Sequence, residues 1–286
     1  MIIAPAIFIS HGAPTFALEP GMLGPRLSSI GERLGNVKAL LIVSPHWQTQ
    51  HTAIMTTPYP STLHDYGGFP PELYRIEHPA IGHPVLATEI GQTLAETGRH
   101  IQLDHRRGFD HGAWVPLRYL DPKAQIPSFQ VSLRSNLDAA GAVRFGRALR
   151  PWRSQGVALI GSGGLTHNLL EFRDGTAHEA AYIQEFRDWV RDAVVRRDVD
   201  QLIDYRRLAP HASRAHPTEE HFLPFLVAIG ASMDGDSVHV IDGGTAHGVL
   251  SMESYAWGLE QPCGALDSER MPAAATVAHQ RDRPAI

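Results

Sequence analysis

The chain of 286 residues contains a single cysteine, Cys263, and carries fewer basic than acidic side chains. One cysteine excludes an intramolecular disulfide framework and any metal site built from several thiolates. The formal net charge of −5 offers no electrostatic reason to expect binding to nucleic acid or to anionic lipid. No run of about 20 apolar residues could span a membrane, and the first residues lack the basic start and apolar core of a signal peptide. We therefore expect a cytoplasmic protein that binds no membrane.

Several common catalytic signatures are also missing from the sequence. No Gly-x-Gly-x-x-Gly follows the first predicted strand and no Gly-x-x-x-x-Gly-Lys-Ser/Thr occurs, so a nucleotide site has no support. The Gly-x-Ser-x-Gly elbow of hydrolases is absent, because Ser162 stands in the different order Gly-Ser-Gly-Gly. There is also no His-Glu-x-x-His motif of the zinc peptidases.

What the sequence has in abundance is histidine, with 17 residues. Histidine is the commonest protein ligand of transition metals and the side chain that titrates near neutral pH. The composition therefore favours metal chemistry or acid–base chemistry.

Short apolar runs alternate with helix-like segments along the chain, which predicts an α/β fold with one central, mostly parallel sheet flanked by helices. The predicted strands are residues 6–9, 39–43, 129–133, 157–160 and 238–241. The predicted helices are residues 84–97, 138–150, 177–197 and 221–230. Residues 57–83 are rich in Pro, Gly and His and are expected to form a long ordered loop. No linker divides the chain, so we expect one domain over residues 1–263 and a tail or extension over 264–286.

Three predicted strands run directly into a histidine, namely His11, His46 and His167. Ligands of open α/β sheets bind outside the carboxyl ends of the strands. Three histidines at three such ends would converge on one crevice if the strands are parallel. Gly12 and the pair Gly163-Gly164 fit positions where the backbone turns tightly or approaches a ligand closely. A single histidine in this position would more often be structural, but the repetition favours a site.

A fourth histidine cluster is His216-Pro-Thr-Glu-Glu-His221. We expect a helix to begin at Pro217 or Thr218, with Glu219 and Glu220 in its first turn, where acidic side chains complement the helix dipole. His221 near the helix start would favour the neutral imidazole, which is the form that binds metal ions.

Two further segments could belong either to a site or to the framework. His111 follows Asp110, which can orient an imidazole or cap a helix. The loop from Leu63 to Pro71 contains His64, Tyr66 and Phe69, and it could line an aromatic pocket or form an ordered turn.

Six motifs in order resemble the class III extradiol ring-cleavage dioxygenases, in particular their DOPA 4,5-dioxygenase-like branch. The resemblance covers about residues 5 to 260. The motifs are His-Gly-Ala-Pro, Ser-Pro-His-Trp, His-Asp-Tyr-Gly-Gly-Phe-Pro, Asp-His-Gly-Ala-Trp, Gly-Ser-Gly-Gly-Leu-Thr-His-Asn and His-Pro-Thr-Glu-Glu-His-Phe-Leu-Pro. The fold that this family implies, an α/β sheet flanked by helices, agrees with the pattern of strands and helices.

The resemblance implies a metal site. His11 and His46 match the two histidine ligands, and the third position of this branch is a histidine, here His221. Glu219 and Glu220 beside it leave the third ligand open, because protocatechuate-type relatives use a glutamate.

The resemblance also implies roles for other residues. His167 matches the active-site acid/base and could also approach the metal, and His111 matches a histidine that helps to bind substrate and oxygen. Expected substrate-binding residues are His64, Tyr66 and Phe69.

The implied activity is Fe(II)-dependent insertion of O₂ into a catechol, with cleavage beside the diol. Three imidazoles would also bind Zn(II), so a zinc hydrolase that uses a metal-activated hydroxide is one alternative. A non-enzymatic binding protein on the same fold is another. Either a monomer or a homo-oligomer is compatible with the sequence.

Overall fold

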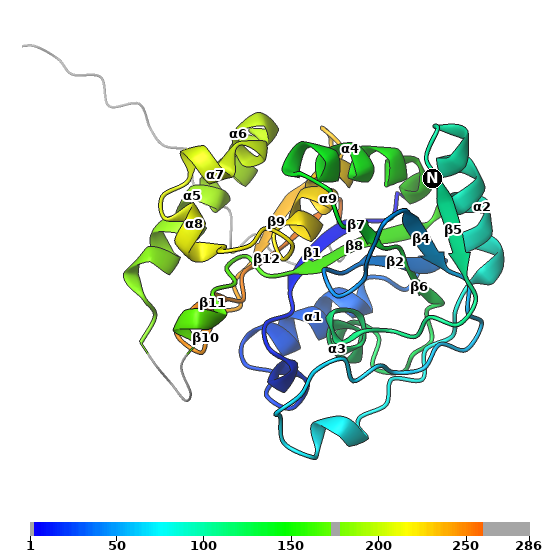
Figure 1. Cartoon of the computed structure of the whole chain (residues 1–286), viewed down its shortest axis with the longest axis horizontal. Helices are drawn as coiled ribbons and strands as arrows, with labels where there is room; N and C mark the ends of the chain where they lie inside the picture. Colours follow the sequence, from blue (N-terminus) through cyan, green and yellow to red (C-terminus); the bar gives the residue numbers. More distant parts are fainter. Residues whose placement is uncertain (1–2, 173–177, 260–286) are drawn as a thin grey trace, which may run out of the picture.

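The computed structural model describes residues 3–172 and 178–259 and is organised around one six-stranded sheet (Figure 1). The strand order is β6-β2-β8-β1-β12-β9. These strands are β6 (Ser128–Gln130), β2 (Ala39–Val43), β8 (Val157–Gly163), β1 (Ala6–Ser10), β12 (Ser254–Trp257) and β9 (Val238–Ile241). The first four run parallel, whereas β12 runs antiparallel to both of its neighbours. The predicted α/β fold with a mostly parallel sheet is therefore confirmed.

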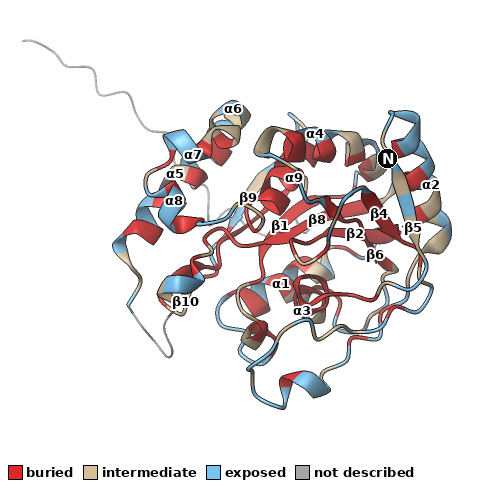
Figure 2. Ribbon diagram, in the orientation of Figure 1, coloured by how far each residue is buried: buried red, intermediate tan, exposed pale blue. Residues whose placement is uncertain are grey.

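Helices cover both faces of this sheet (Figure 1). On one face α9 (Leu223–Ala231) packs on β8 and β1, and α4 (Ala139–Leu149) packs on α9. On the other face lie α1 (Leu23–Glu32) and α3 (His111–Leu120). Every residue of α9 is buried, as expected for a helix that is apolar on all sides. The core thus consists of two layers of apolar side chains, one on each face of a sheet whose central strands are buried (Figure 2).

Smaller elements surround this core. They are β3 (Gln48–Thr49) paired with β7 (Leu133–Arg134), β4 (Thr52–Met55) paired with β5 (Ile101–Asp104), α2 (Pro84–Glu96), α5 (Ala181–Arg196), α6 (Val199–Ile203), α7 (Tyr205–Leu208), α8 (Ala212–Ala215), and β10 (Thr245–Ala246) paired with β11 (Leu250–Ser251). The four predicted helices match α2, α4, α5 and α9. The buried face of α5 consists of Tyr182, Ile183, Phe186, Val190, Ala193 and Val194.

The predicted strand over residues 129–133 is wrong in its second half. β6 ends at Gln130 because successive backbone N–H groups then change partners. Val131 donates to Ile42 of the main sheet, Ser132 to Ala53, and Leu133 to Trp47. The chain therefore leaves the large sheet and begins β7 beside β3.

The predicted helix start at Pro217 or Thr218 is also wrong, since α9 begins at Leu223. Pro224 lies in the first turn of α9, where its missing N–H has no cost. A helix starting at residue 217 would put this proline in its interior, at a cost of about 3 kcal/mol. Residues 217–222 form turns instead, and Glu219 and Glu220 are not helical.

Residues 57–83 form the long ordered loop that was predicted. Their only regular features are a 3₁₀ helix at Leu73–Arg75 and a bridge between Thr62 and Phe109. Within the described parts of the chain, no helix is both long and apolar enough to cross a membrane. Cys263 and the predicted tail over 264–286 lie outside the described residues.

Candidate metal centre

Two histidines meet where parallel strands of the sheet end. His11 follows β1 directly, and His46 follows β2 after a short turn. Their Nε2 atoms are 3.2 Å apart. Two nitrogens that each lie about 2.1 Å from one ion, at an angle of about 100°, are separated by about this distance. The convergence that the sequence predicted for these two strand ends is therefore present.

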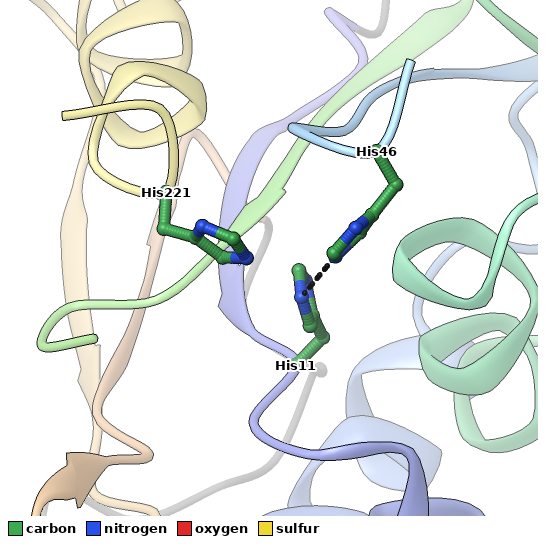
Figure 3. Close-up of side chains that lie close together, drawn as sticks. All are labelled: His11, His46 and His221. Atoms are coloured by element: carbon green, nitrogen blue, oxygen red, sulfur yellow. Dashed lines mark hydrogen bonds between the residues drawn. The ribbon is translucent and has the colours of Figure 1, made fainter. Parts of the chain in front are cut away.

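His221 completes a set of three imidazoles (Figure 3). Its ring centre lies 5.7 Å from that of His11 and 5.1 Å from that of His46. One nitrogen from each of the three rings lies within 4.8 Å of the others, an arrangement that could hold a metal ion. Gly163 makes this approach possible, because a Cβ there would lie 2.3 Å from the carbonyl oxygen of His221.

Hydrogen bonds orient two of these rings. Ser162 Oγ lies 2.9 Å from Nδ1 of His11, and Glu220 Oε1 lies 3.1 Å from Nδ1 of His221. Such partners fix the tautomer and leave Nε2 available for a metal. Glu219, by contrast, accepts a hydrogen bond of 3.1 Å from the hydroxyl of Tyr205.

All three imidazoles are neutral at pH 7. Burial lowers the pKa of His46 to about 3, and the neighbouring His111 contributes to this shift. Burial also holds the pKa values of His11 and His221 well below the ordinary value of histidine. Neutral imidazoles present lone pairs, so the chemistry of this donor set fits a transition metal.

The backbone conformation at position 12, directly after His11, requires a glycine. Its φ of +62° lies in the left-handed region that favours glycine. A Cβ at this position would also lie 2.8 Å from Sδ of Met252. The expectation that the chain turns tightly behind His11 is thereby confirmed.

His111 lies beside the three imidazoles, at the first position of α3. Its ring centre is 3.9 Å from that of His46. Asp65 Oδ1 accepts hydrogen bonds from both the backbone N–H (3.0 Å) and Nδ1 (2.9 Å) of His111. Although burial acts in the opposite direction, these bonds lower the pKa of Asp65 to about 2. Nε2 of His111 is thus the ring nitrogen left available.

His167 lies on the other side of His221. The two rings are stacked with centres 3.4 Å apart and planes within 7° of parallel. Burial lowers the pKa of His167, and the carboxylate of Glu220 acts in the opposite direction. The ring is only partly buried, so a bound molecule can reach it.

Of the three predicted substrate-binding residues, Tyr66 comes nearest to the cluster. Its ring centre is 5.5 Å from that of His111, and burial raises its pKa to about 12. His64 packs against Tyr66 and Trp114, and its Nε2 lies 3.0 Å from the carbonyl of Ile76. Phe69 packs against Tyr66 at 5.4 Å. His64 and Phe69 therefore support Tyr66.

Comparison with known proteins decides the family. Residues 5–252 match the family model described as the catalytic LigB subunit of aromatic ring-opening dioxygenase. The chain belongs to the LigB family. The 4,5-DOPA dioxygenase extradiol of Beta vulgaris is 36% identical, over 88% of this chain and 96% of the relative. The enzyme of the same name from Escherichia coli K12 is 34% identical, over 89% and 94%.

A solved structure supports the same assignment. The crystal structure of an uncharacterized protein from Escherichia coli K12 superposes with a TM-score of 0.72 at 28% identity. It covers 88% of this chain and 99% of its own. The LigB-family protein described here is thus an extradiol aromatic ring-opening dioxygenase. This membership favours the dioxygenase hypothesis over a zinc hydrolase or a non-enzymatic binding protein.

Sequence reasoning missed two supporting side chains of this LigB-family site, Asp65 and Ser162. Asp65 stands in the loop motif that was examined for its aromatic residues, and Ser162 was considered only as a nucleophile. Each contacts a histidine from a distant part of the chain, so no local pattern could reveal its role.

Sequence reasoning also missed a partly buried hydrogen-bond network that contacts the backbone of His46. Arg107 Nη2 donates to the carbonyl of His46 (3.3 Å) and to Asp110 Oδ2 (3.0 Å), which also accepts from Gln130 Nε2 (2.8 Å). Asp110 makes no side-chain cap to α3, contrary to one of its two expected roles. The network ties the His46 loop to the start of α3.

Proposed function

We propose that this LigB-family dioxygenase uses Fe(II) to cleave the ring of a catechol that carries a small, DOPA-like side chain. The observation that carries the proposal is the convergence of three neutral imidazoles with His111 and His167 at their edges. The names of the relatives from Beta vulgaris and Escherichia coli support the substrate class.

His11, His46 and His221 would hold the metal. Their donors are neutral and within reach of one another, which a divalent ion requires. Glu220 would act behind His221 by orienting its ring, and Glu219 is occupied by Tyr205. When bound, Fe(II) supplies Lewis acidity and open positions for a catechol and O₂.

His167 would act as the acid/base of the reaction. Because its pKa is lowered by burial, the ring is neutral at pH 7 and can accept a proton from a catechol hydroxyl. Stacking against His221 holds the ring next to the site of reaction. The imidazole of His167 can return this proton as the catechol ring opens.

His111 and Tyr66 would position the substrate and oxygen. Asp65 holds Nδ1 of His111, so Nε2 can form a hydrogen bond with a bound oxygen atom. Tyr66 packs at the edge of the His111 ring, with His64 and Phe69 behind it, and this aromatic wall excludes water from the substrate ring.

The test is O₂ uptake by protein that is reconstituted anaerobically with Fe(II) and mixed with a panel of catechols. We expect uptake with a yellow ring-fission product, greatest with DOPA-like side chains, and no uptake with Zn(II), which has no redox chemistry. His167→Ala should lose the activity. The control is His211→Asn. His211 is exposed and lies outside the cluster, and asparagine tolerates the left-handed backbone conformation at this position. Absence of uptake with iron demonstrably bound would refute the proposal.

A further inference from the structure

A cavity of about 360 Å³ opens beside the first turns of α4, and none of its lining residues belongs to the histidine cluster. Its lining comes from the turn between β3 and β4, the segment between α2 and β5, β7, and α4 itself. Its volume is within the range of pockets that bind small molecules.

The lining of this cavity is basic. Among the residues that the structure describes, the lining contains no aspartate or glutamate but has three arginines and two histidines: Arg99, Arg134, Arg144, His51 and His100. The rings of the two histidines are 4.3 Å apart. This concentration of positive charge occurs in a chain whose formal net charge is −5, so it is not a general property of the surface. Like charges gathered in one cavity favour an anion.

The arginines of this cavity are not neutralised by the fold. Within residues 3–172 and 178–259, the guanidinium of Arg134 has neither an ion-pair nor a hydrogen-bond partner. Arg144 lies 3.8 Å from Asp138 Oδ1, but both side chains are more than half exposed and that oxygen already accepts the N–H of Gly141. An exposed pair at this distance contributes little. Both guanidinium groups remain available to a ligand.

A second cavity, of about 290 Å³, differs in how its arginines are used. It too contains three arginines, Arg147, Arg150 and Arg197, but Asp234 lines it as well. Arg150 donates to the carbonyl of Gly230 at 2.7 Å, and Arg197 donates to that of Met233 at 3.0 Å. There two of the three arginines bind the backbone and serve the fold.

We propose that the cavity beside α4 binds a small organic anion, with its acidic group between Arg134 and Arg144. Guanidinium groups bind carboxylates and phosphates through paired hydrogen bonds, and the two acids share this chemistry. Leu137 and Phe145 also line the cavity, and they provide an apolar surface for the body of the ligand. The occupant is therefore an acid with an apolar part rather than a bare inorganic ion.

The proposal is tested by isothermal titration calorimetry of the iron-loaded full chain at constant ionic strength. The probes are phthalate, an aromatic dicarboxylate, and phenyl phosphate, an aromatic phosphate. We expect saturable binding of at least one probe at one site per chain, and the probe that binds identifies the acid. Arg134→Gln should weaken binding at least about tenfold, which corresponds to about 1.4 kcal/mol. Arg144→Gln should act in the same direction.

Two matched controls separate this site from its surroundings. Arg147→Gln removes the same charge from the second cavity and should leave the affinity unchanged. His46→Ala disables the histidine cluster and should also leave it unchanged. Three results would overturn the proposal: no saturable binding of either probe, an equal loss in Arg147→Gln, or binding that disappears in His46→Ala.

Discussion

His216 and His221 lie close together in the sequence, both are buried, and burial lowers the pKa of both, yet they have different surroundings. His216 packs against Phe186, Tyr205 and Phe222, and its Nε2 lies 2.8 Å from the carbonyl of Leu165. His221 instead shares a possible metal site with His11 and His46, and the ring of His167 stacks on it. A buried, neutral histidine is therefore no evidence of a site by itself. What distinguishes His221 is that its ring nitrogens converge with other donors.

If converging donors are what distinguishes a metal site from a buried histidine such as His216, the largest effect on metal binding is expected from His46→Ala. Loss of one imidazole should reduce the affinity for Fe(II) by more than about 100-fold, since partners of ligands alone contribute 10- to 100-fold. O₂ uptake should fall to background. Iron content and calorimetry measure the effect, and His216→Gln is the matched variant that should retain iron. If His46→Ala kept its iron, the metal would have to lie elsewhere.

The next largest effect is expected from His167→Ala. Removing an acid/base group should lower kcat by about 10²- to 10⁴-fold. Iron content should stay the same, because His167 is not one of the three converging rings. Single-turnover kinetics with the preferred catechol measure the change. A variant that loses iron as well would show that His167 is a ligand.

A smaller effect on activity is expected at Asp65. Comparing its alanine and asparagine variants separates the orientation of His111 from the negative charge of the carboxylate. Oδ1 of Asp65 accepts both hydrogen bonds from His111, and the amide oxygen of an asparagine could accept both as well. Asp65→Ala should therefore lower kcat/KM about tenfold or more, the scale on which orienting partners act. Asp65→Asn should recover much of that loss. Equal losses in the two variants would mean that the negative charge matters, not the orientation.

The last effect is expected on stability rather than on activity and concerns His216. Its pKa is about 3 in the folded protein against 6.5 when unperturbed, so protonation favours the unfolded chain. The stability that neutral His216 contributes is complete above pH 6.5 and is lost as the pH falls, by about 1.4 kcal/mol per pH unit.

His216→Gln keeps a donor for the carbonyl of Leu165 but cannot titrate. Denaturant unfolding between pH 7 and pH 5 should thus show a shallower pH dependence for this variant than for the native chain. Identical slopes would show that His216 is not the group that takes up the proton.

Much of the parallel part of the sheet was predictable from sequence, and so was the edge strand β9, whereas β12 between β1 and β9 was not. β1, β2 and β8 are apolar runs buried on both faces, which short β-branched segments indicate. β12 was missed because its four residues, Ser-Tyr-Ala-Trp, show no run or alternation that differs from loop sequence. Its place between β1 and β9 depends on pairing with residues far away in the chain.

The residues of the candidate site were likewise only partly predictable from sequence. His11, His46 and His167 could be identified because each follows a recognisable strand. The third position stayed open between His221 and its neighbours Glu219 and Glu220, because relatives of the protocatechuate type use a glutamate there. Pro224 moves the helix start to Leu223, and the resulting turn directs Glu219 toward Tyr205.

The sequence alone determined the fold class, the LigB family and the histidines that meet at the ends of the strands. These depend on local runs of apolar residues and on ordered motifs, which are properties of neighbours in the chain. Only the tertiary structure decided that His221 joins His11 and His46, that Asp65 holds His111, and that Ser162 faces His11. Each of these contacts joins residues from separate segments, and a hydrogen bond depends on distance and angle in space, which spacing along a chain does not specify.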